Sequence, residues 1–149
     1  MLLIVKDGSL LLAMKKRGFG KGKWNGPGGK LHHSETPEEA CIRETQEELG
    51  ITPLNIQKVA EHVFLYPATS ETVIGHIFLA TSFTGTPTES EEMAPQWFAL
   101  CDIPYQQMWD DDIYWLPAVL AGRKLRCSFT FGQDNKLASS HIKEVAEIQ

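Results

Sequence analysis

The chain has 149 residues, the length of one domain, and its 42% of hydrophobic and 22% of charged residues are ordinary values for a globular protein. These values exclude a disordered chain and a coiled coil. Nineteen acidic residues against 14 basic ones give a net charge of −5, which argues against a protein that grips a nucleic-acid polymer. An anionic small substrate would therefore require local lysines or a metal ion.

The cysteines and the apolar segments indicate where the protein works. Cys41, Cys101 and Cys127 form no CxxC pair, and an odd number of cysteines suits a reducing compartment. The apolar start of the chain meets charged residues too soon for the core of a signal peptide. No apolar run approaches the roughly 20 residues that span a bilayer. We expect a cytoplasmic protein with no membrane contact.

The first 30 residues predict a hairpin followed by a loop. Two apolar runs, 2–5 and 10–14, flank Asp7-Gly8, which is the turn chemistry of a β-hairpin. Residues 15–30 are rich in glycine and lysine and show no apolar periodicity. We therefore expect a long loop there, and a loop of this length in a compact domain usually has a function.

A helix is predicted next, with a signal at each end. Thr36 can cap it, Pro37 fits its first position, and Glu39 completes a capping box. The helix is expected to run to about Leu49, where Gly50 supplies the left-handed residue that ends it.

Beyond residue 53 the pattern changes to strands and one more helix. The runs that predict strands are Ile56–Tyr66, Thr72–Phe83, Gln96–Leu100, Leu125–Phe131 and Leu137–Val145. The second helix is expected at about Ile113–Ala121, but Pro117 is tolerated only near a first turn, so its start stays open. Two helices and about seven strands predict an α/β (α+β) fold, a mixed sheet covered by helices, in one domain over residues 1–149.

The sharpest feature is a row of carboxylates on the first helix. Spacings of three and four place Glu44, Glu47 and Glu48 on one helix face, where like charges repel unless something compensates. A solvated acidic face is the plain alternative. Arg43 lies beside the row, however, and the preceding loop holds exposed glycine backbone at 26–29. It also holds six basic residues: Lys15, Lys16, Arg17, Lys21, Lys23 and Lys30. Together these features indicate a site for a metal–polyphosphate.

Other phosphate and metal motifs do not fit. No Gly-Lys pair is followed by Ser or Thr, so a Walker A loop is absent, and no window matches GxGxxG. The five histidines (His32, His33, His62, His76 and His141) show no ligand spacing and are expected to be structural or exposed.

The residues from Gly29 to Ile51 resemble the Nudix box, GX5EX7REUXEEXGU, in which U is bulky and apolar. Gly29, Glu35 and the run from Arg43 to Ile51 fill every fixed position, and the one departure is Thr45, where the pattern prefers an aliphatic residue. The resemblance implies the Nudix α/β/α sandwich and hydrolysis of a nucleoside diphosphate linked to another group. We expect Thr45 to affect packing more than chemistry.

The same resemblance implies roles for the acidic row. Glu44, Glu47 and Glu48 would ligate Mg²⁺, with Mn²⁺ as the alternative, together with the carbonyl of Gly28. Arg43 would orient the glutamates. Glu92, in an acidic segment at 89–92, would be a further ligand, and Glu44 and Glu92 are the candidates for the general base. For Glu92 the plain alternative is a solvated loop residue.

Over nearly the whole chain the sequence resembles the MutT-homologue branch of this family, the oxidised purine nucleoside triphosphatases (8-oxo-dGTP diphosphatases). The matching segments are 14–20, 24–26, 85–87, 97–98, 108–109 and 114–115. The resemblance implies conversion of 8-oxo-dGTP and 2-oxo-dATP to monophosphates and pyrophosphate, which sanitises the nucleotide pool and serves DNA repair. The implied substrate-binding residues are Lys15, Phe19, Asn25, Pro27, Gly28, Gly29, Lys30, Phe64, Trp109, Asp110, Asp111 and Asp112.

Two of these residues suggest how a base is read. Asp111 and Asp112 in one apolar pocket should not both ionise, so one would donate a hydrogen bond to the base while the other accepts one. Moving that proton could let one pocket take both oxidised guanine and oxidised adenine. The plain alternatives are that the aspartates cap the second helix and that Trp109 and Phe64 belong to the core.

Three departures from that branch bear on base preference: the chain starts late in its first strand, Pro27 stands where an aromatic residue is usual, and Tyr66 replaces Phe. One alternative function is therefore a Nudix pyrophosphohydrolase for another nucleotide, such as modified or unmodified dATP. The other is a non-catalytic Nudix-fold domain that binds nucleotides or a partner, although no glutamate of the box is lost. We expect a monomer that acts on a small-molecule purine nucleoside triphosphate.

Overall fold

The N-terminal hairpin forms as the sequence predicts. In the computed structural model, which describes residues 1–149, β1 (Leu2–Lys6) pairs antiparallel with β2 (Ser9–Lys15). The turn residues Asp7 and Gly8 have φ values of 51° and 75°, the left-handed conformation that such two-residue turns require. Leu2, Ile4 and Leu11 from this hairpin are fully buried.

The chain forms two compact units, residues 1–57 with 78–109 and residues 58–77 with 110–149. The elements of the first unit are β1, β2, β3 (Trp24–Asn25), α1 (Pro37–Leu49), β4 (Thr52–Leu54), the end of β6 (Glu71–Ala80), β7 (Ser82–Thr84) and β8 (Met93–Ala99). β1 pairs parallel with residues 78–80 of β6, while β2 pairs antiparallel with β3 and β8. β4 and β7 form a separate antiparallel pair.

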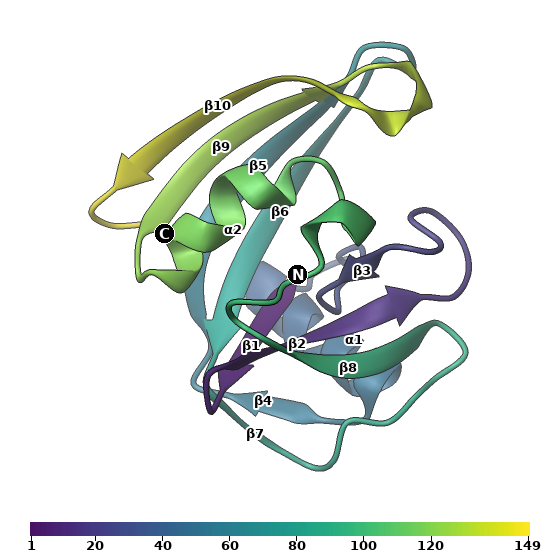
Figure 1. Ribbon diagram of the computed structural model, residues 1–149, viewed down its shortest axis with the longest axis vertical. Coiled ribbons are helices and arrows are strands. Elements are labelled where there is room, and N and C mark those ends of the chain that lie inside the picture. Colours follow the sequence, from purple (N-terminus) through teal and green to yellow (C-terminus); the bar gives the residue numbers. More distant parts are fainter. The chain divides into compact units, whose positions relative to one another are not determined.

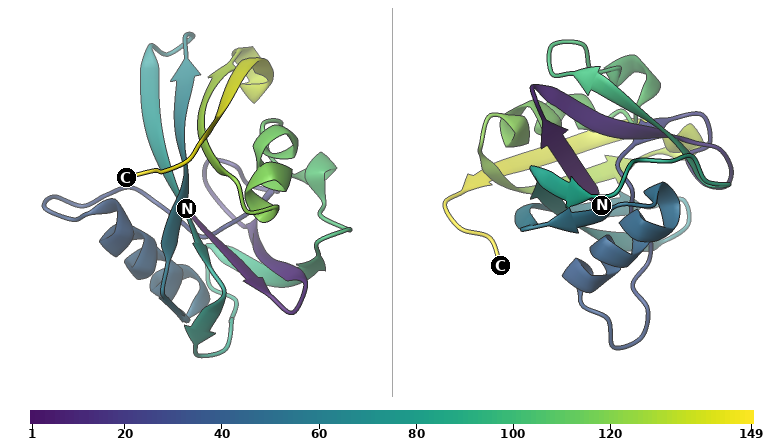
Figure 2. Two further views of the ribbon diagram at one scale, coloured as in Figure 1. Left: turned by 90° about the vertical axis from the view of Figure 1, so that its left-hand side faces the viewer. Right: turned by 90° about the horizontal axis from the view of Figure 1, so that it is seen from below.

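Helix α1 contacts β4 and β8 and contributes to the core of the first unit. Cys41 and Leu49 from α1 pack in one cluster with Ile4, Phe78 and Met93. Figure 2 shows α1 together with the loop that precedes it. Burial of this apolar side of the helix leaves its other side for charged residues.

The second unit places one helix against strands. Its elements are β5 (Gln57–Tyr66), most of β6, α2 (Asp112–Leu120), β9 (Lys124–Phe131) and β10 (Leu137–Val145). β5 pairs parallel with β9, and β9 pairs antiparallel with β10. α2 contacts β9 (Figure 1), and Trp115, Leu116 and Val119 are its buried apolar residues.

The predicted α+β class with mixed strand pairing is confirmed, and so are α1 and β10 with their predicted bounds. Several details differ. The strand predicted at Gln96–Leu100 begins earlier, since β8 spans Met93–Ala99. The run predicted at Thr72–Phe83 is two strands, because β6 ends at Ala80. β3 and β4 were not predicted, since two or three residues show no periodicity. α2 begins at Asp112 and keeps Pro117 beyond its first turn, so the prediction that Pro117 must lie near that turn was wrong.

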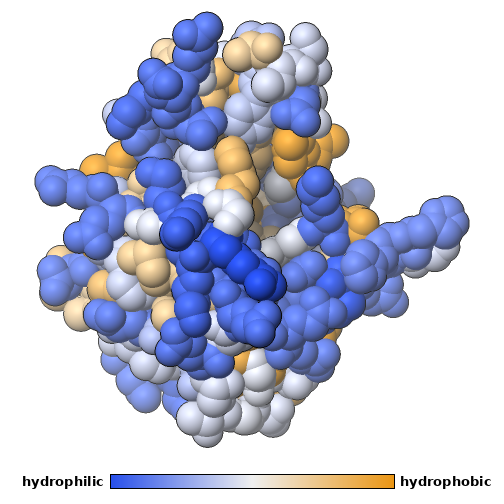
Figure 3. Space-filling view, turned by 90° about the vertical axis from the view of Figure 1, so that its right-hand side faces the viewer, coloured by the Kyte–Doolittle hydropathy of each residue, from blue (hydrophilic) through white to orange (hydrophobic).

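The surface carries scattered apolar residues. The large ones with the greatest exposure are Phe19, Tyr114, Ile74 and Ile113. On the face shown in Figure 3, hydrophobic residues form small groups separated by hydrophilic ones. No helix has both the length and the apolar character that crossing a membrane requires.

Candidate active site

Both ends of α1 are fixed by hydrogen bonds that the sequence predicts. The Thr36 hydroxyl accepts from the Glu39 N–H at 3.2 Å, and the Glu39 carboxylate accepts from the Thr36 N–H at 2.8 Å, which is a complete capping box. Gly50 ends the helix at φ 70°. The acidic row on α1 is therefore carried by a helix that is fixed at both ends.

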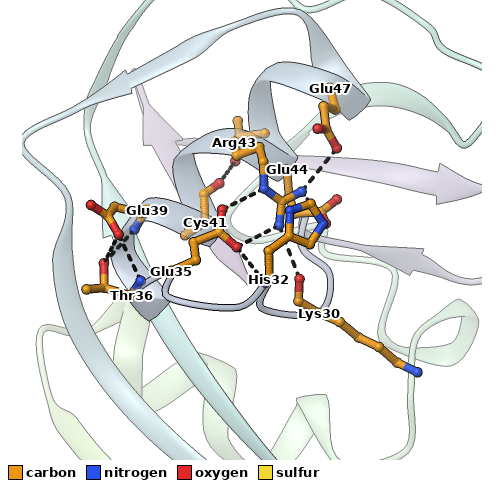
Figure 4. Close-up of polar contacts among 10 residues, drawn as sticks. Lys30, His32, Glu35, Thr36, Glu39, Cys41, Arg43, Glu44 and Glu47 are labelled. Carbon is orange, nitrogen blue, oxygen red and sulfur yellow. Dashed lines mark hydrogen bonds and ion pairs between the residues drawn. The ribbon is translucent and has the colours of Figure 1, made fainter.

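Arg43 compensates the repulsion within the acidic row (Figure 4). Its Nη1 donates to Glu44 Oε1 at 2.9 Å and to Glu47 Oε2 at 3.2 Å. The side chain of Glu44 is 15% exposed and that of Glu47 is 58% exposed. Arg43 therefore contacts two of the three glutamates directly.

The closest partner of Arg43 is Glu35, to which the sequence analysis gave no role beyond its place in the motif. Arg43 Nε and Nη2 donate to Glu35 Oε1 and Oε2 at 2.6 and 2.9 Å, and Nη2 also donates to the Lys30 carbonyl at 3.1 Å. Glu35 also accepts from the His32 N–H at 2.8 Å. Hydrogen bonds from Arg43 and His32 lower the pKa of Glu35 to about 2. Arg43 therefore ties the 30–35 loop to the acidic row.

Glu48 connects the helix to the glycine segment. It is 6% exposed, and its Oε2 accepts from the Gly28 N–H at 3.1 Å. Burial, with a smaller contribution from the charge of Glu44, raises the pKa of Glu48 to about 7. A Cβ atom at Gly29 would collide with the Glu44 carboxylate, so any other residue there would displace that side chain from its present position.

Glu92 meets the basic segment at 15–17. It accepts from Lys15 Nζ at 3.2 Å and from Arg17 Nε at 2.6 Å, and these bonds lower its pKa. β2 and β8 bring the two segments together, since Lys15 pairs with Met93 in the sheet register. The contact between Arg17 and Glu92 was not predicted, because pairing of β2 with β8 is a non-local feature.

The acidic residues do not form a ready metal cage, because no three Asp, Glu, His or Cys side chains converge on one point. Glu44 and Glu47 are turned toward Arg43, Glu48 toward Gly28 and Glu92 toward Lys15 and Arg17. The donor set nevertheless suits a hard divalent cation, since it consists of carboxylates. Burial disfavours the anionic form of Glu48, and a cation would restore that form.

In the first unit, Phe19 of the loop meets Trp109. The rings of Phe19 and Trp109 are 5.0 Å apart and tilted by 32°, and Lys23 Nζ lies 5.2 Å from the centre of the Trp109 ring. Phe19 is 66% exposed. Asn25, on β3, accepts from the Gly26 N–H through its side chain at 3.0 Å.

In the second unit, one indole joins two buried aspartates. Trp115 Nε1 donates to Asp111 Oδ2 and to Asp112 Oδ1, both at 3.1 Å. The aspartates are 3% and 4% exposed, and burial, with a contribution from Asp110, raises the pKa of Asp111 to about 6. Asp111 precedes α2 but makes no side-chain cap, so its carboxyl is not used as the plain alternative expected.

The other residues of this unit that were predicted for a base pocket have different surroundings. The Asp110 carboxylate accepts from the Leu137 N–H at 3.2 Å and so holds the start of β10. Phe64 packs against Phe129 and Phe131, with ring centres 5.8 and 6.3 Å apart, and Tyr66 stacks on Phe131 at 5.6 Å. Trp115 was not predicted as a site residue, although a Trp three and four positions after two aspartates is a usable signal.

Comparison with known proteins gives matches over most of the chain. The NUDIX domain family matches residues 1–119. An oxidized purine nucleoside triphosphate hydrolase of Danio rerio is 42% identical over 148 residues, which are 99% of this chain and 95% of the relative. The protein of the same name in Mus musculus is 43% identical over 145 residues, 97% of this chain and 93% of the relative. The crystal structure of the MutT protein of Bacillus halodurans superposes with a TM-score of 0.86 at 26% identity, over 95% of this chain and 94% of that one.

Proposed function

This chain belongs to the Nudix family and is a Nudix hydrolase, and from this premise we propose that it hydrolyses oxidised purine nucleoside triphosphates. Its substrates would be nucleotides such as 8-oxo-dGTP and 2-oxo-dATP, and its products the monophosphate and pyrophosphate. The relatives that are 42% and 43% identical over almost the full chain carry the name of this activity. The buried acid pair Asp111–Asp112 is the observation that carries the choice of base.

Nudix hydrolases require a divalent cation, and we propose Mg²⁺, with Mn²⁺ as the alternative. The carboxylates of Glu44, Glu47, Glu48 and Glu92 and the carbonyl of Gly28 would hold it. When bound, the cation offsets phosphate charge and activates a water molecule. The proton of the attacking water would pass to the carboxylate of Glu44 or of Glu92.

Lys15 and Arg17 would exchange their carboxylate partner for the phosphates of the substrate. Lys15 and Arg17 are paired with Glu92 and lie on the segment that we propose to meet the substrate. A polyphosphate would compete with Glu92 for both cations, which would free that carboxylate for a ligand or base role. Lys30 and the backbone of Pro27, Gly28 and Gly29 would complete the phosphate contacts.

The base would be read by the aspartates of α2. Burial raises the pKa of Asp111 to about 6, so this carboxyl takes up a proton a little below neutral pH. With Asp111 protonated and Asp112 ionised, the pair would offer the base one donor and one acceptor. Oxidised purines carry an additional N–H or C=O group that such a pair can bind. In the same unit, Phe64 would supply a further contact with the base. The residues of the first unit that the family resemblance implies for base binding are Trp109, as a stacking face, and Phe19 and Asn25.

The test is pyrophosphate release with Mg²⁺ at low substrate, comparing 8-oxo-dGTP, 2-oxo-dATP, dGTP and dATP, with Glu47→Gln as the control. We expect kcat/KM to favour an oxidised purine by about tenfold or more, which is about 1.4 kcal/mol of transition-state discrimination. Metal-dependent turnover without that preference would assign the chain to another nucleotide. No turnover with any of the four would favour a nucleotide-binding role.

We further propose a cytoplasmic monomer that acts on free nucleotides and not on nucleic-acid polymers. The three cysteines are unpaired, which suits a reducing compartment. A net charge of −5 disfavours binding to a polyanion. On the face shown in Figure 3 the hydrophobic residues form small groups separated by hydrophilic ones, which favours a monomer. Light scattering would show the oligomeric state directly.

A further inference from the structure

His62, on β5, is a buried imidazole that has no hydrogen-bond partner in the protein. Its residue is 1% exposed, and neither Nδ1 nor Nε2 is paired. Burying polar atoms without hydrogen bonds lowers stability, and an apolar residue of similar size would avoid that loss. A group of this kind indicates a polar partner that the folded chain does not itself supply.

The surroundings of His62 are aromatic on three sides. Its ring lies edge-on to Phe64, Trp115 and Phe129, with ring centres 5.6, 4.5 and 5.3 Å apart. Because side chains alternate along a strand, His62, Phe64 and Tyr66 share one face of β5. Phe64 stands opposite Phe129 in the parallel register with β9. His62 is therefore part of the aromatic surface that α2 covers.

Trp115 links His62 to the acid pair. The indole that lies 4.5 Å from the imidazole is the one whose Nε1 donates to Asp111 and Asp112. Trp115 thus has its single N–H committed to the aspartates and can offer none to His62. Three buried titratable side chains, two of them paired and one unpaired, gather around one ring.

The protonation state of His62 is settled by its environment. Burial lowers the pKa of the imidazole to about 3, so the ring is neutral throughout the physiological range. A neutral imidazole has one N–H donor and one acceptor nitrogen. Its chemistry is that of a fixed, uncharged hydrogen-bonding group.

We infer that His62 is a further specificity-determining residue, whose imidazole hydrogen-bonds the polar edge of the bound purine base directly or through one water molecule. This inference rests on the proposed function. The ligand class is a purine with an additional N–H or C=O group, and the base binds beside the Asp111–Asp112 pair. The hydrogen bond that His62 lacks in the protein alone is made when the base is present.

The test separates a role in base recognition from a role in packing. Loss of a recognition residue should lower substrate preference without lowering the melting temperature, whereas loss of a packing residue should lower the melting temperature. His62→Leu removes both nitrogens and should leave the melting temperature unchanged or raised. We expect the same variant to lower the ratio of kcat/KM between the preferred oxidised purine and its normal counterpart by fivefold or more, through KM and not kcat. His62→Gln and His62→Asn, which keep a donor and an acceptor, should restore part of the ratio. His141→Leu, an exposed histidine of β10, is the matched control.

A second readout does not require turnover. In protein labelled with ¹⁵N at histidine, addition of 8-oxo-dGMP should shift the imidazole nitrogens of His62 and leave those of His141 in place. An unchanged ratio in a stable His62→Leu variant, with no shift on nucleotide binding, would make His62 a packing residue while the proposed function stands. If the wild type prefers a different base, the proposed function fails, and the same ratio for that base tests His62. If the wild type turns over nothing and binds no nucleotide, both proposals fall together.

Discussion

Around α1, charged side chains satisfy one another, whereas around α2 a few polar groups lie among aromatic rings. Arg43 alone donates to Glu35, Glu44 and Glu47. In the second unit, Asp111 and Asp112 share one donor, and His62 has none. In a dense charge network one charged partner can replace another. A metal–phosphate that binds there would take the place of such a partner. A sparse buried set discriminates, because a base with the wrong donors leaves a polar group unpaired.

The largest expected effect tests whether the α1 region is used for chemistry. Glu48→Gln keeps an oxygen for the Gly28 N–H but removes the carboxylate charge. We expect kcat to fall by about 10²–10³-fold, since one preorganised charge is lost from the reacting centre. The melting temperature should not fall, because burial already disfavours the ionised acid. Steady-state kinetics with Mg²⁺ measure the first effect and calorimetry the second.

The control for that variant is Glu38→Gln, an exposed glutamate on the first turn of the same helix. It should keep wild-type activity. If Glu48→Gln also stayed within about threefold of the wild type, the charge network of α1 would be structural only and the comparison would fail.

A smaller effect is expected when the network is loosened and its charge is kept. Arg43→Lys cannot reproduce the two-pronged bond to Glu35 together with the bonds to Glu44 and Glu47. We expect activity or metal affinity to fall by about 10–100-fold, as for other residues that orient metal ligands. Titration of activity with Mg²⁺ measures both. Arg123→Lys, an exposed arginine whose nearest carboxylate is 3.9 Å away, is the control and should change nothing.

The α2 region should respond in substrate choice instead of rate. Asp111→Asn fixes one donor and one acceptor and prevents proton exchange with Asp112. We expect the preference between 8-oxo-dGTP and 2-oxo-dATP to change by about tenfold, about 1.4 kcal/mol. Competition between the two nucleotides in one reaction measures that ratio. An unchanged ratio would remove the aspartate pair from base recognition.

Asp111→Asn should also change how the free energy of unfolding depends on pH. Because burial raises the pKa of Asp111 from 3.8 to about 6, the folded protein binds this proton more tightly than the unfolded chain does. The stabilisation from this group is therefore complete below about pH 4 and declines as the pH rises to about 6. Asp111→Asn should gain stability relative to the wild type across that window, by up to about 3 kcal/mol. Urea unfolding at pH 4, 5, 6 and 7 measures the gain, and Asp102→Asn, an exposed aspartate, should show none.

The smallest effect concerns the support of the charge network. Thr36→Ala removes the side-chain cap of α1 and should lower the free energy of unfolding by about 1 kcal/mol. Activity should persist, since Thr36 lies away from the acidic row. Chemical denaturation compares it with Thr86→Ala, an exposed loop threonine. A loss no larger than that of the control would show that the capping box does not hold α1.

Local chemistry explains what the sequence predicts well. The hairpin at Asp7-Gly8 and both ends of α1 depend on residues a few positions apart, and the structure has them where the sequence places them. The row of Glu44, Glu47 and Glu48 follows from helix periodicity alone. Its partner Glu35 was already a fixed position of the motif, but only the path of the loop shows that Arg43 binds it more closely than the row.

Non-local pairing explains what the sequence does not predict. Two of the three ring neighbours of His62 come from β9 and α2, which are far along the chain, so Phe64 is the one neighbour that the local sequence shows. The meeting of Arg17 with Glu92 depends on the register of β2 and β8. In α2, burial of Trp115, Leu116 and Val119 outweighs the hydrogen bond that Pro117 cannot donate.

Two glycines of the loop, Gly29 and Gly22, resist substitution for different reasons. At Gly29 the Cβ of an L-residue would meet the Glu44 carboxylate, so that side chain would have to move. Gly22 has φ +86° and open space around it, so it is closed to L-residues by conformation and not by contact. A D-alanine introduced there by chemical synthesis would match that backbone conformation and reduce the freedom of the unfolded chain. Mirror-image substitution could therefore stiffen the loop beside the site and leave every side chain of the site in place.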